Sequence, residues 1–115
     1  GVSIALMHGH GGFLPYWLDK VQYVAQGYRF ERYQRICSRA AGQAQVVIFG
    51  HTHHPEVRWL DGRLWFNPGS SCHALYGGVW PSLGLLRLGP DGAIVPEIVP
   101  LTGYQRIGRI WQVKE

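Results

Sequence analysis

Two short and almost wholly apolar segments, residues 2–7 and 45–49, stand out in the hydrophobic pattern of the chain. Apolar runs of this length that end at glycine are typical of buried strands. Each run is followed by a loop rich in glycine and histidine, at residues 8–12 and 50–55. The pattern therefore predicts two buried strands, each ending in a loop that carries histidines.

The segment between these strands predicts helices. Residues 28–41 repeat apolar side chains at helical spacing, and Gly42 is a suitable helix end. A shorter helix is predicted from Pro15 to Gly27. Strand, helix and strand in this order imply a right-handed parallel crossover. Both histidine loops would then lie at the carboxyl ends of neighbouring strands, where open α/β sheets bind their ligands.

The pattern after residue 55 predicts β structure. Four strands are expected in two hairpins, which pair residues 57–60 with 63–66 and residues 83–88 with 93–99. Asp61-Gly62 is a strong signal for a two-residue turn in the first hairpin. Pro96 predicts an edge position for the last strand, because proline cannot donate to a ladder. The pattern assigns no structure to residues 102–115.

Composition narrows the class of protein. The 115 residues suit one domain, and 46% hydrophobic against 16% charged residues argues against disorder. No apolar run approaches the roughly 20 residues of a membrane span, so we expect no membrane association. Two cysteines are too few for a disulfide scaffold, and a reducing, cytoplasmic setting is expected.

The chain is basic, with a formal net charge of +4. Such a balance suits an anionic substrate, a nucleic acid or an acidic partner. The predicted helix over residues 28–41 carries a face of Arg29, Arg32, Arg35 and Arg39. One short cationic stripe without interleaved aromatic residues favours a solvated helix face, and nucleic acid remains an open but less favoured partner.

The histidines carry the candidate chemistry. His8 and His10 are two residues apart, and so are His51 and His53. At an extended strand end, side chains at positions i and i+2 point the same way, so each pair could aim at one centre. Neutral imidazole is a common ligand for divalent metals. The pattern predicts a metal or phosphate site, with His54 and His73 outside it as structural or rim residues.

Three motifs in order resemble the calcineurin-like metallophosphoesterases, most closely their small single-domain phosphodiesterases of bacteria and archaea. They are Met-His-Gly-His at residues 7–10, Phe-Gly-His-Thr-His-His-Pro at 49–55, and Phe-Asn-Pro-Gly-Ser at 66–70. The resemblance runs over residues 2–88. It implies the α/β (α+β) fold class, with this chain as the carboxyl half of a four-layer α/β/β/α sandwich.

The resemblance also implies roles for individual residues. His8 and His51 would bind one divalent metal and His53 a second. His10 would act as a catalytic residue beside the substrate phosphate. Mn²⁺ is the first candidate for both ions, with Fe, Zn, Ni and Mg as alternatives. Asn67 is a candidate substrate contact, although its loop is better suited to support the loop of His51 and His53, since Pro68 removes one amide donor.

The remaining ligands of that family, in Asp-x-His, Gly-Asp and Gly-Asn elements, have no counterpart in this sequence. Asp61 and Asp91 fall in predicted turns, and Asp19 falls in the shorter helix. We therefore expect residues 1–115 to form a partial domain whose amino-terminal half is missing. That half would belong to a longer chain or to a partner chain. Alone, these residues should bind metal weakly.

The function expected from this resemblance is hydrolysis of a small phosphoester, as a phosphodiesterase or phosphatase, by a water activated between two metals. The alternative is a non-catalytic scaffold of the same fold in a protein complex, as in the retromer complex. Cys72-His73 is disfavoured as a nucleophile pair because no orienting acid is visible. A homo-oligomer stays open.

Overall fold

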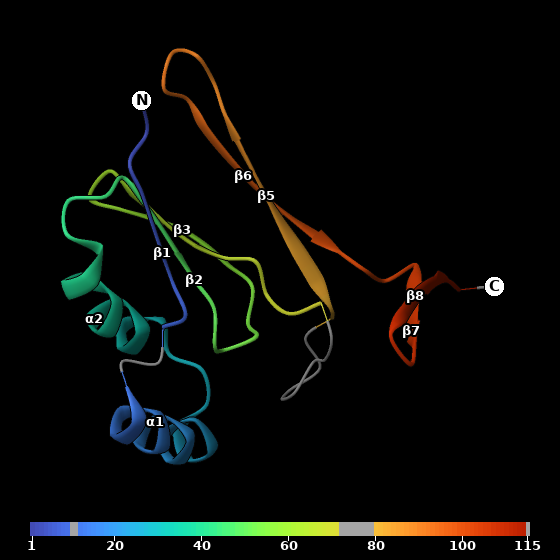
Figure 1. Ribbon diagram of the computed structural model, residues 1–115. Coiled ribbons are helices and arrows are strands. Elements are labelled where there is room, and N and C mark those ends of the chain that lie inside the picture. The colour runs from blue at the N-terminus through green and yellow to red at the C-terminus, as the bar shows by residue number, and fades with distance from the viewer. Residues whose placement is uncertain (10–11, 72–79, 115) are drawn as a thin grey trace.

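The computed structural model describes residues 1–9, 12–71 and 80–114 (Figure 1). The helices of these ranges are α1 (Phe13–Gln26) and α2 (Phe30–Ala41). The strands are β1 (Ile4–Met7), β2 (Val46–Phe49), β3 (Glu56–Leu60), β4 (Arg63–Asn67), β5 (Ser82–Leu88), β6 (Ile94–Pro100), β7 (Tyr104–Ile107) and β8 (Ile110–Val113). The result is a mixed α+β fold, as the sequence predicts.

The two apolar segments lie side by side in a four-stranded sheet with the order β1-β2-β4-β3. β1 pairs with β2 in parallel, and β2 pairs with β4 in parallel. β3 and β4 form the predicted antiparallel hairpin. Its turn residues Asp61 and Gly62 have φ of 51° and 73°, the positive values that a type I′ turn requires. The predicted parallel pairing and the first hairpin are therefore confirmed.

Helix α2 covers one face of this sheet. Its buried residues Phe30, Tyr33 and Cys37 pack against strand residues that include Phe49 and Trp65. The rings of Phe30 and Trp65 meet edge to face, with their centroids 5.8 Å apart. Burial in this core raises the pKa of the Cys37 thiol to about 11, so the thiol remains protonated at neutral pH.

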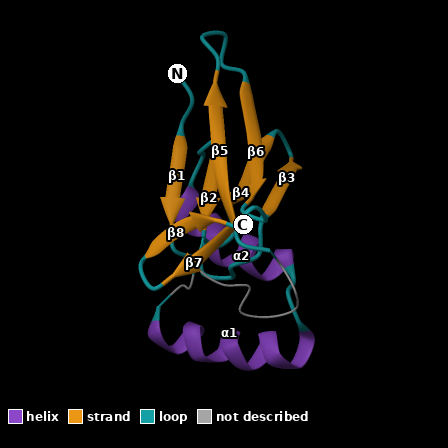
Figure 2. Ribbon diagram, turned by 90° about the vertical axis from the view of Figure 1, so that its right-hand side faces the viewer, coloured by secondary structure: helices purple, strands orange, loops and turns teal. Residues whose placement is uncertain are grey.

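Side chains alternate between the two faces of a strand, so the opposite face of this sheet carries the remaining strand side chains. Val46, Leu64 and Phe66 are buried there, and Leu86 of β5 and Ile98 of β6 pack against them. β5 and β6 form a two-stranded antiparallel sheet that lies over this face (Figures 1 and 2). Burial on both faces explains the continuous apolar run of the inner strand β2. β1 lies at the edge of the sheet, and its Ile4 and Leu6 are 43% and 78% exposed, so the prediction of a buried strand at residues 2–7 is wrong for these side chains.

The ends of the elements follow the predicted signals closely. Gly27 and Gly42 cap the two helices at positive φ. Pro96 lies in a strand of the two-stranded sheet, where both strands are edges. The segment without a predicted structure contains a further hairpin, β7 with β8, which turns at Gly108 with φ 62°.

Helix α1 lies beyond the ends toward which β1 and β2 run, below α2 in both views (Figures 1 and 2). Its apolar residues Leu14, Trp17, Leu18 and Val21 are 54–69% exposed. None of the buried residues of the two cores comes from α1, as far as the structure describes the chain. None of the described helices has the length and apolar character needed to cross a membrane.

We predict that Gly84→Ala weakens the packing of β5 on the first sheet. A Cβ at this position would lie 2.5 Å from Cζ of Phe66 and 2.8 Å from Cβ of Pro68. Such overpacking should lower the free energy of unfolding by about 1–3 kcal/mol in urea denaturation. Gly103→Ala is the control, because no atom lies within 4 Å of its added Cβ. Equal stabilities of the two variants would contradict the packing described here.

Candidate metallophosphoesterase site

The two histidine loops lie side by side at the carboxyl ends of β1 and β2. The Gly50 amide donates to the carbonyl oxygen of His8 at 3.2 Å and so links the loops directly. The imidazole rings of His8 and His51 are also close, with centroids 5.2 Å apart and planes at 61°. The parallel pairing of the strands thus brings together two of the three predicted metal ligands.

The backbone of the second loop differs from the extended strand end assumed from the sequence. His51 and His53 have φ of 69° and 55°, in the left-handed region. The Thr52 amide donates to the Gly50 carbonyl at 2.8 Å, which closes a tight turn centred on His51. Non-glycine residues in this region cost about 1–3 kcal/mol each, and such strain is concentrated at functional sites. The turn, and not strand alternation, directs these side chains.

Asn67 holds this turn in place. Its side chain is completely buried at the end of β4. Its Nδ2 donates to Oγ1 of Thr52 at 2.9 Å and to the carbonyl of Gly50 at 3.3 Å, and its Oδ1 accepts from the Gly69 amide at 3.0 Å. All these partners are protein atoms. The geometry therefore gives Asn67 the supporting role, and its predicted contact with substrate finds no support here.

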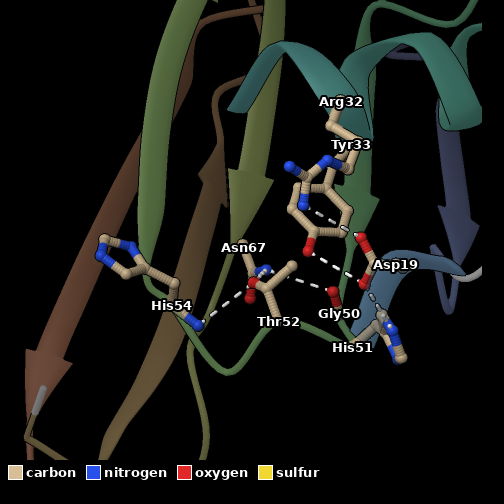
Figure 3. A network of polar contacts seen from close by, with 8 residues as sticks. All are labelled: Asp19, Arg32, Tyr33, Gly50, His51, Thr52, His54 and Asn67. Atoms are coloured by element: carbon tan, nitrogen blue, oxygen red, sulfur yellow. Dashed lines mark hydrogen bonds and ion pairs between the residues drawn. The ribbon is translucent and has the colours of Figure 1, made fainter. Parts of the chain in front are cut away.

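Asp19 of α1 lies at the centre of a buried polar cluster (Figure 3). Its Oδ2 is 3.2 Å from Nε2 of His51 and accepts a hydrogen bond from the Tyr33 hydroxyl at 3.0 Å. Its Oδ1 is 3.5 Å from Nη1 of Arg32. The Asp19 side chain is only 5% exposed. This carboxylate therefore joins both helices to the second histidine loop.

The predicted solvated arginine face of α2 is wrong for Arg32. Its side chain is 10% exposed and pairs with Asp19, whereas Arg29, Arg35 and Arg39 are exposed as expected. The physical reason is that Asp19 and Gln26 of α1 accept hydrogen bonds from the Arg32 guanidinium, at 3.5 and 3.4 Å. Burial and the neighbouring carboxylate raise the pKa of Tyr33 well above its ordinary value, so its hydroxyl remains a hydrogen-bond donor.

A cavity of about 390 Å³ opens between α1 and the two histidine loops. His8, His51 and His53 all line it, and Asp19 and Tyr16 line its α1 side. Nδ1 of His53 is buried and has no hydrogen-bond partner in the described part of the chain. Leaving such an atom unpaired costs about 1–3 kcal/mol. An unpaired imidazole nitrogen beside a cavity fits a ligand atom for a metal.

The side chains around the cavity could supply some of the ligands of a metal site, but not a complete set. Residues 1–9, 12–71 and 80–114 contain no group of three or more His, Cys, Asp or Glu side chains placed to hold a metal ion. The imidazoles are of the right type for a divalent transition metal. His51, however, directs Nε2 to Asp19, and within these ranges no carboxylate joins His8 and His53 in such a group. Further ligands would have to complete the site.

The other histidines divide into two groups. His54 stacks on Tyr28, with ring centroids 4.1 Å apart and planes at 3°, and its Nδ1 lies 3.2 Å from the carbonyl oxygen of Pro55. It has the structural role expected from the sequence. His10 and His73, together with Cys72, lie outside the described residues, so their predicted roles remain predictions.

Sequence reasoning missed Asp19 and Tyr16 as parts of the site. The available signal was the helical pattern of α1, where Tyr16, Asp19, Lys20 and Tyr23 share one face and the apolar residues the opposite one. A lone carboxylate among aromatic residues marks that face as one that meets other polar groups. The pattern alone does not reveal that His51, 32 residues later, is the partner.

We predict that Asp19→Ala lowers the free energy of unfolding by about 3 kcal/mol, because it leaves the buried Arg32 guanidinium and Tyr33 hydroxyl without their acceptor. Urea denaturation measures the change. Glu31→Ala is the matched control, since Glu31 also pairs with an arginine, Arg58 at 3.6 Å, but is 68% exposed. Its loss should be within about 1 kcal/mol. A similar small loss for Asp19→Ala would refute the central role of this carboxylate.

Comparisons with known proteins identify a family and a fold. Residues 1–87 match the family model described as a calcineurin-like phosphoesterase superfamily domain. Vacuolar Protein Sorting 29 from Cryptosporidium parvum has the same fold: it is 23% identical, with a TM-score of 0.53 over 96% of this chain and 49% of that one. No curated protein matches the sequence.

Two further solved structures are similar over part of their length. A Thermotoga maritima protein solved by NMR is 28% identical, with a TM-score of 0.45 over 88% of this chain and 49% of its own. An archaeal phosphodiesterase is 24% identical, with a TM-score of 0.45 over 85% and 46%. The chain thus spans about half the length of these structures. From the match over residues 1–87, the chain belongs to the calcineurin-like phosphoesterase superfamily.

Proposed function

We propose that this chain contributes the histidine-bearing half of a metal-dependent phosphoesterase that hydrolyses a small phosphoester. The observation that carries the proposal is that His8, His51 and His53 line one cavity in a chain of the calcineurin-like phosphoesterase superfamily. The remaining ligands would come from a segment outside residues 1–115 or from a partner chain. A cytoplasmic location, expected from the sequence, belongs to the same proposal.

In this proposal His8 and His51 hold one divalent ion and His53 the other, with Mn²⁺ as the first candidate. Two such ions would lower the pKa of a water molecule and neutralise the charge of the phosphate. Imidazole ligands are neutral, so the chain leaves the metal charge available to an anionic substrate. The unpaired Nδ1 of His53 supports its assignment as a ligand.

The chain's own groups would position these ligands. Asp19 lies 3.2 Å from Nε2 of His51 and fixes the orientation of that ring. A carboxylate in this position raises the basicity of a metal-binding imidazole, provided that the opposite nitrogen faces the metal. Lys20 lines the cavity and supplies a cation for the phosphate oxygens. His10, by its place in the motif, would also contact the phosphate.

The alternative is a non-catalytic scaffold with the same fold. The exposed apolar residues of α1 favour it, because large exposed apolar patches mark interaction surfaces. A scaffold needs no metal and no turnover, so activity separates the two functions. Phosphoesterase activity is favoured because the strained loop and the unpaired nitrogen of His53 both belong to the cavity.

We predict that His8→Ala, His51→Ala and His53→Ala each lower kcat/KM by about 100-fold or more in the full-length protein with Mn²⁺. The substrate is bis-p-nitrophenyl phosphate, and elemental analysis measures the bound metal alongside. Excess Mn²⁺ should restore part of the lost activity by mass action. His10→Ala should retain the metal and slow turnover.

His54→Ala is the matched control, because His54 is in the same loop but stacks on Tyr28 and does not line the cavity. It should keep its activity within a few-fold. Full activity of a metal-free His51→Ala protein would refute the dimetal mechanism. Absence of any hydrolysis by the metal-loaded wild-type protein would favour the scaffold.

A further inference from the structure

The cavity has two chemically different walls. The histidine loops form one wall, and α1 forms the other with Tyr16, Lys20, Tyr23 and Val24. Metal ligands and a lysine suit an anionic phosphate. Beyond the tyrosine hydroxyls, which can donate to phosphate, this wall offers aromatic rings and a valine, and these gain free energy by covering apolar surface of a ligand.

Tyr16 is the residue of this wall whose ring lies against the proposed metal ligands. Its ring centroid is 5.3 Å from that of His51, with the planes at 55°. The ring is partly exposed and borders the cavity. A group attached to a phosphate beside His51 would therefore meet this ring.

The surroundings hold the Tyr16 ring in place. Nζ of Lys20 lies 4.8 Å from its centroid, within the range of a cation–π interaction. Trp17 meets Tyr16 edge to face, with the ring centroids 6.0 Å apart. These contacts restrict the ring, so less side-chain freedom is lost when a ligand stacks on it.

We propose that the phosphoester bound in this cavity carries a planar aromatic group next to its phosphate, and that Tyr16 is the surface against which this group packs. The inference rests on the proposed function, since it names the class of substrate for the same site. An aromatic pair contributes beyond the burial of its area, whereas a methyl group in the same place would gain little from the ring.

Two phosphate monoesters that differ only in this group isolate the contact. In both phenyl phosphate and methyl phosphate, water attacks phosphorus, the P–O bond to phenol or methanol breaks, and inorganic phosphate is released and measured. In the full-length protein, Tyr16→Ala should lower the phenyl-to-methyl ratio of kcat/KM by about 5- to 10-fold. Because the ratio is compared between variants, the intrinsic reactivities of the substrates cancel.

Two variants serve as controls. Tyr16→Phe keeps the ring and should keep the ratio. Leu18 is 56% exposed on the opposite face of α1, outside the cavity, so Leu18→Ala should also keep the ratio. An unchanged ratio in Tyr16→Ala, or an equal fall in Leu18→Ala, would overturn the proposal.

A binding measurement separates this proposal from the proposed function. Calorimetry of the full-length protein with phenylphosphonate and with methylphosphonate compares ligands of equal charge that differ in the ring. We expect tighter binding of phenylphosphonate, and loss of that preference in Tyr16→Ala. If this holds while neither ester is hydrolysed, the aromatic site stands and the catalytic proposal fails. If hydrolysis depends on His51 but no aromatic preference exists, the catalytic proposal stands and this one fails.

Discussion

The buried carboxylate of Asp19 connects helix α1, which contributes no residue to the two hydrophobic cores of the described chain, to α2 and to the second histidine loop. It accepts hydrogen bonds from α2, through Tyr33 and Arg32, and it meets His51 of the loop after β2. Helix α1 contributes no buried residue to either core in the described chain, and its apolar face points outward. The position of α1, and with it one wall of the cavity, therefore depends on this polar cluster.

The histidine loops depend on a second set of contacts. The parallel pairing of β1 and β2 places them together, and the Gly50 amide bonds to His8. The fully buried Asn67 then holds the strained turn through Thr52 and Gly50. A turn with two non-glycine residues at positive φ persists only when its surroundings fix it. These buried hydrogen bonds offset the strain and keep His51 and His53 at the cavity.

Local signals explain what the sequence could predict. The apolar runs, the glycine helix ends and Asp61-Gly62 each act within a few residues, so the amino-acid pattern alone locates the two helices, the strands from β1 to β6 and the first hairpin, but not β7 and β8. The pairing of the histidine loops follows from chain order. Contacts between distant segments explain what the sequence did not predict. By helical periodicity Arg32 belongs to a solvated face, and it is buried only because it pairs with Asp19 of α1.

The geometry of His51 and His53 could not be predicted in this way, because their positive φ values depend on hydrogen bonds to Asn67 and the loop that follows β4. A motif, and not the spacing of the residues, suggests their roles. That motif implies metal ligands. The described part of the chain places three histidines around one cavity but does not supply a complete set of ligands there. We infer that this cavity is one side of a metal centre.

Anomalous X-ray scattering from crystals of the full-length protein grown with Mn²⁺ tests this claim most directly. We expect anomalous peaks in the cavity, with imidazole nitrogens of His8, His51 and His53 as ligands at about 2.0–2.2 Å. Crystals of His53→Ala should lose one of these ions or hold it at reduced occupancy. Crystals in which Mn²⁺ binds elsewhere, while the imidazoles of all three histidines face away from any ion, would rule out a metal centre in this cavity.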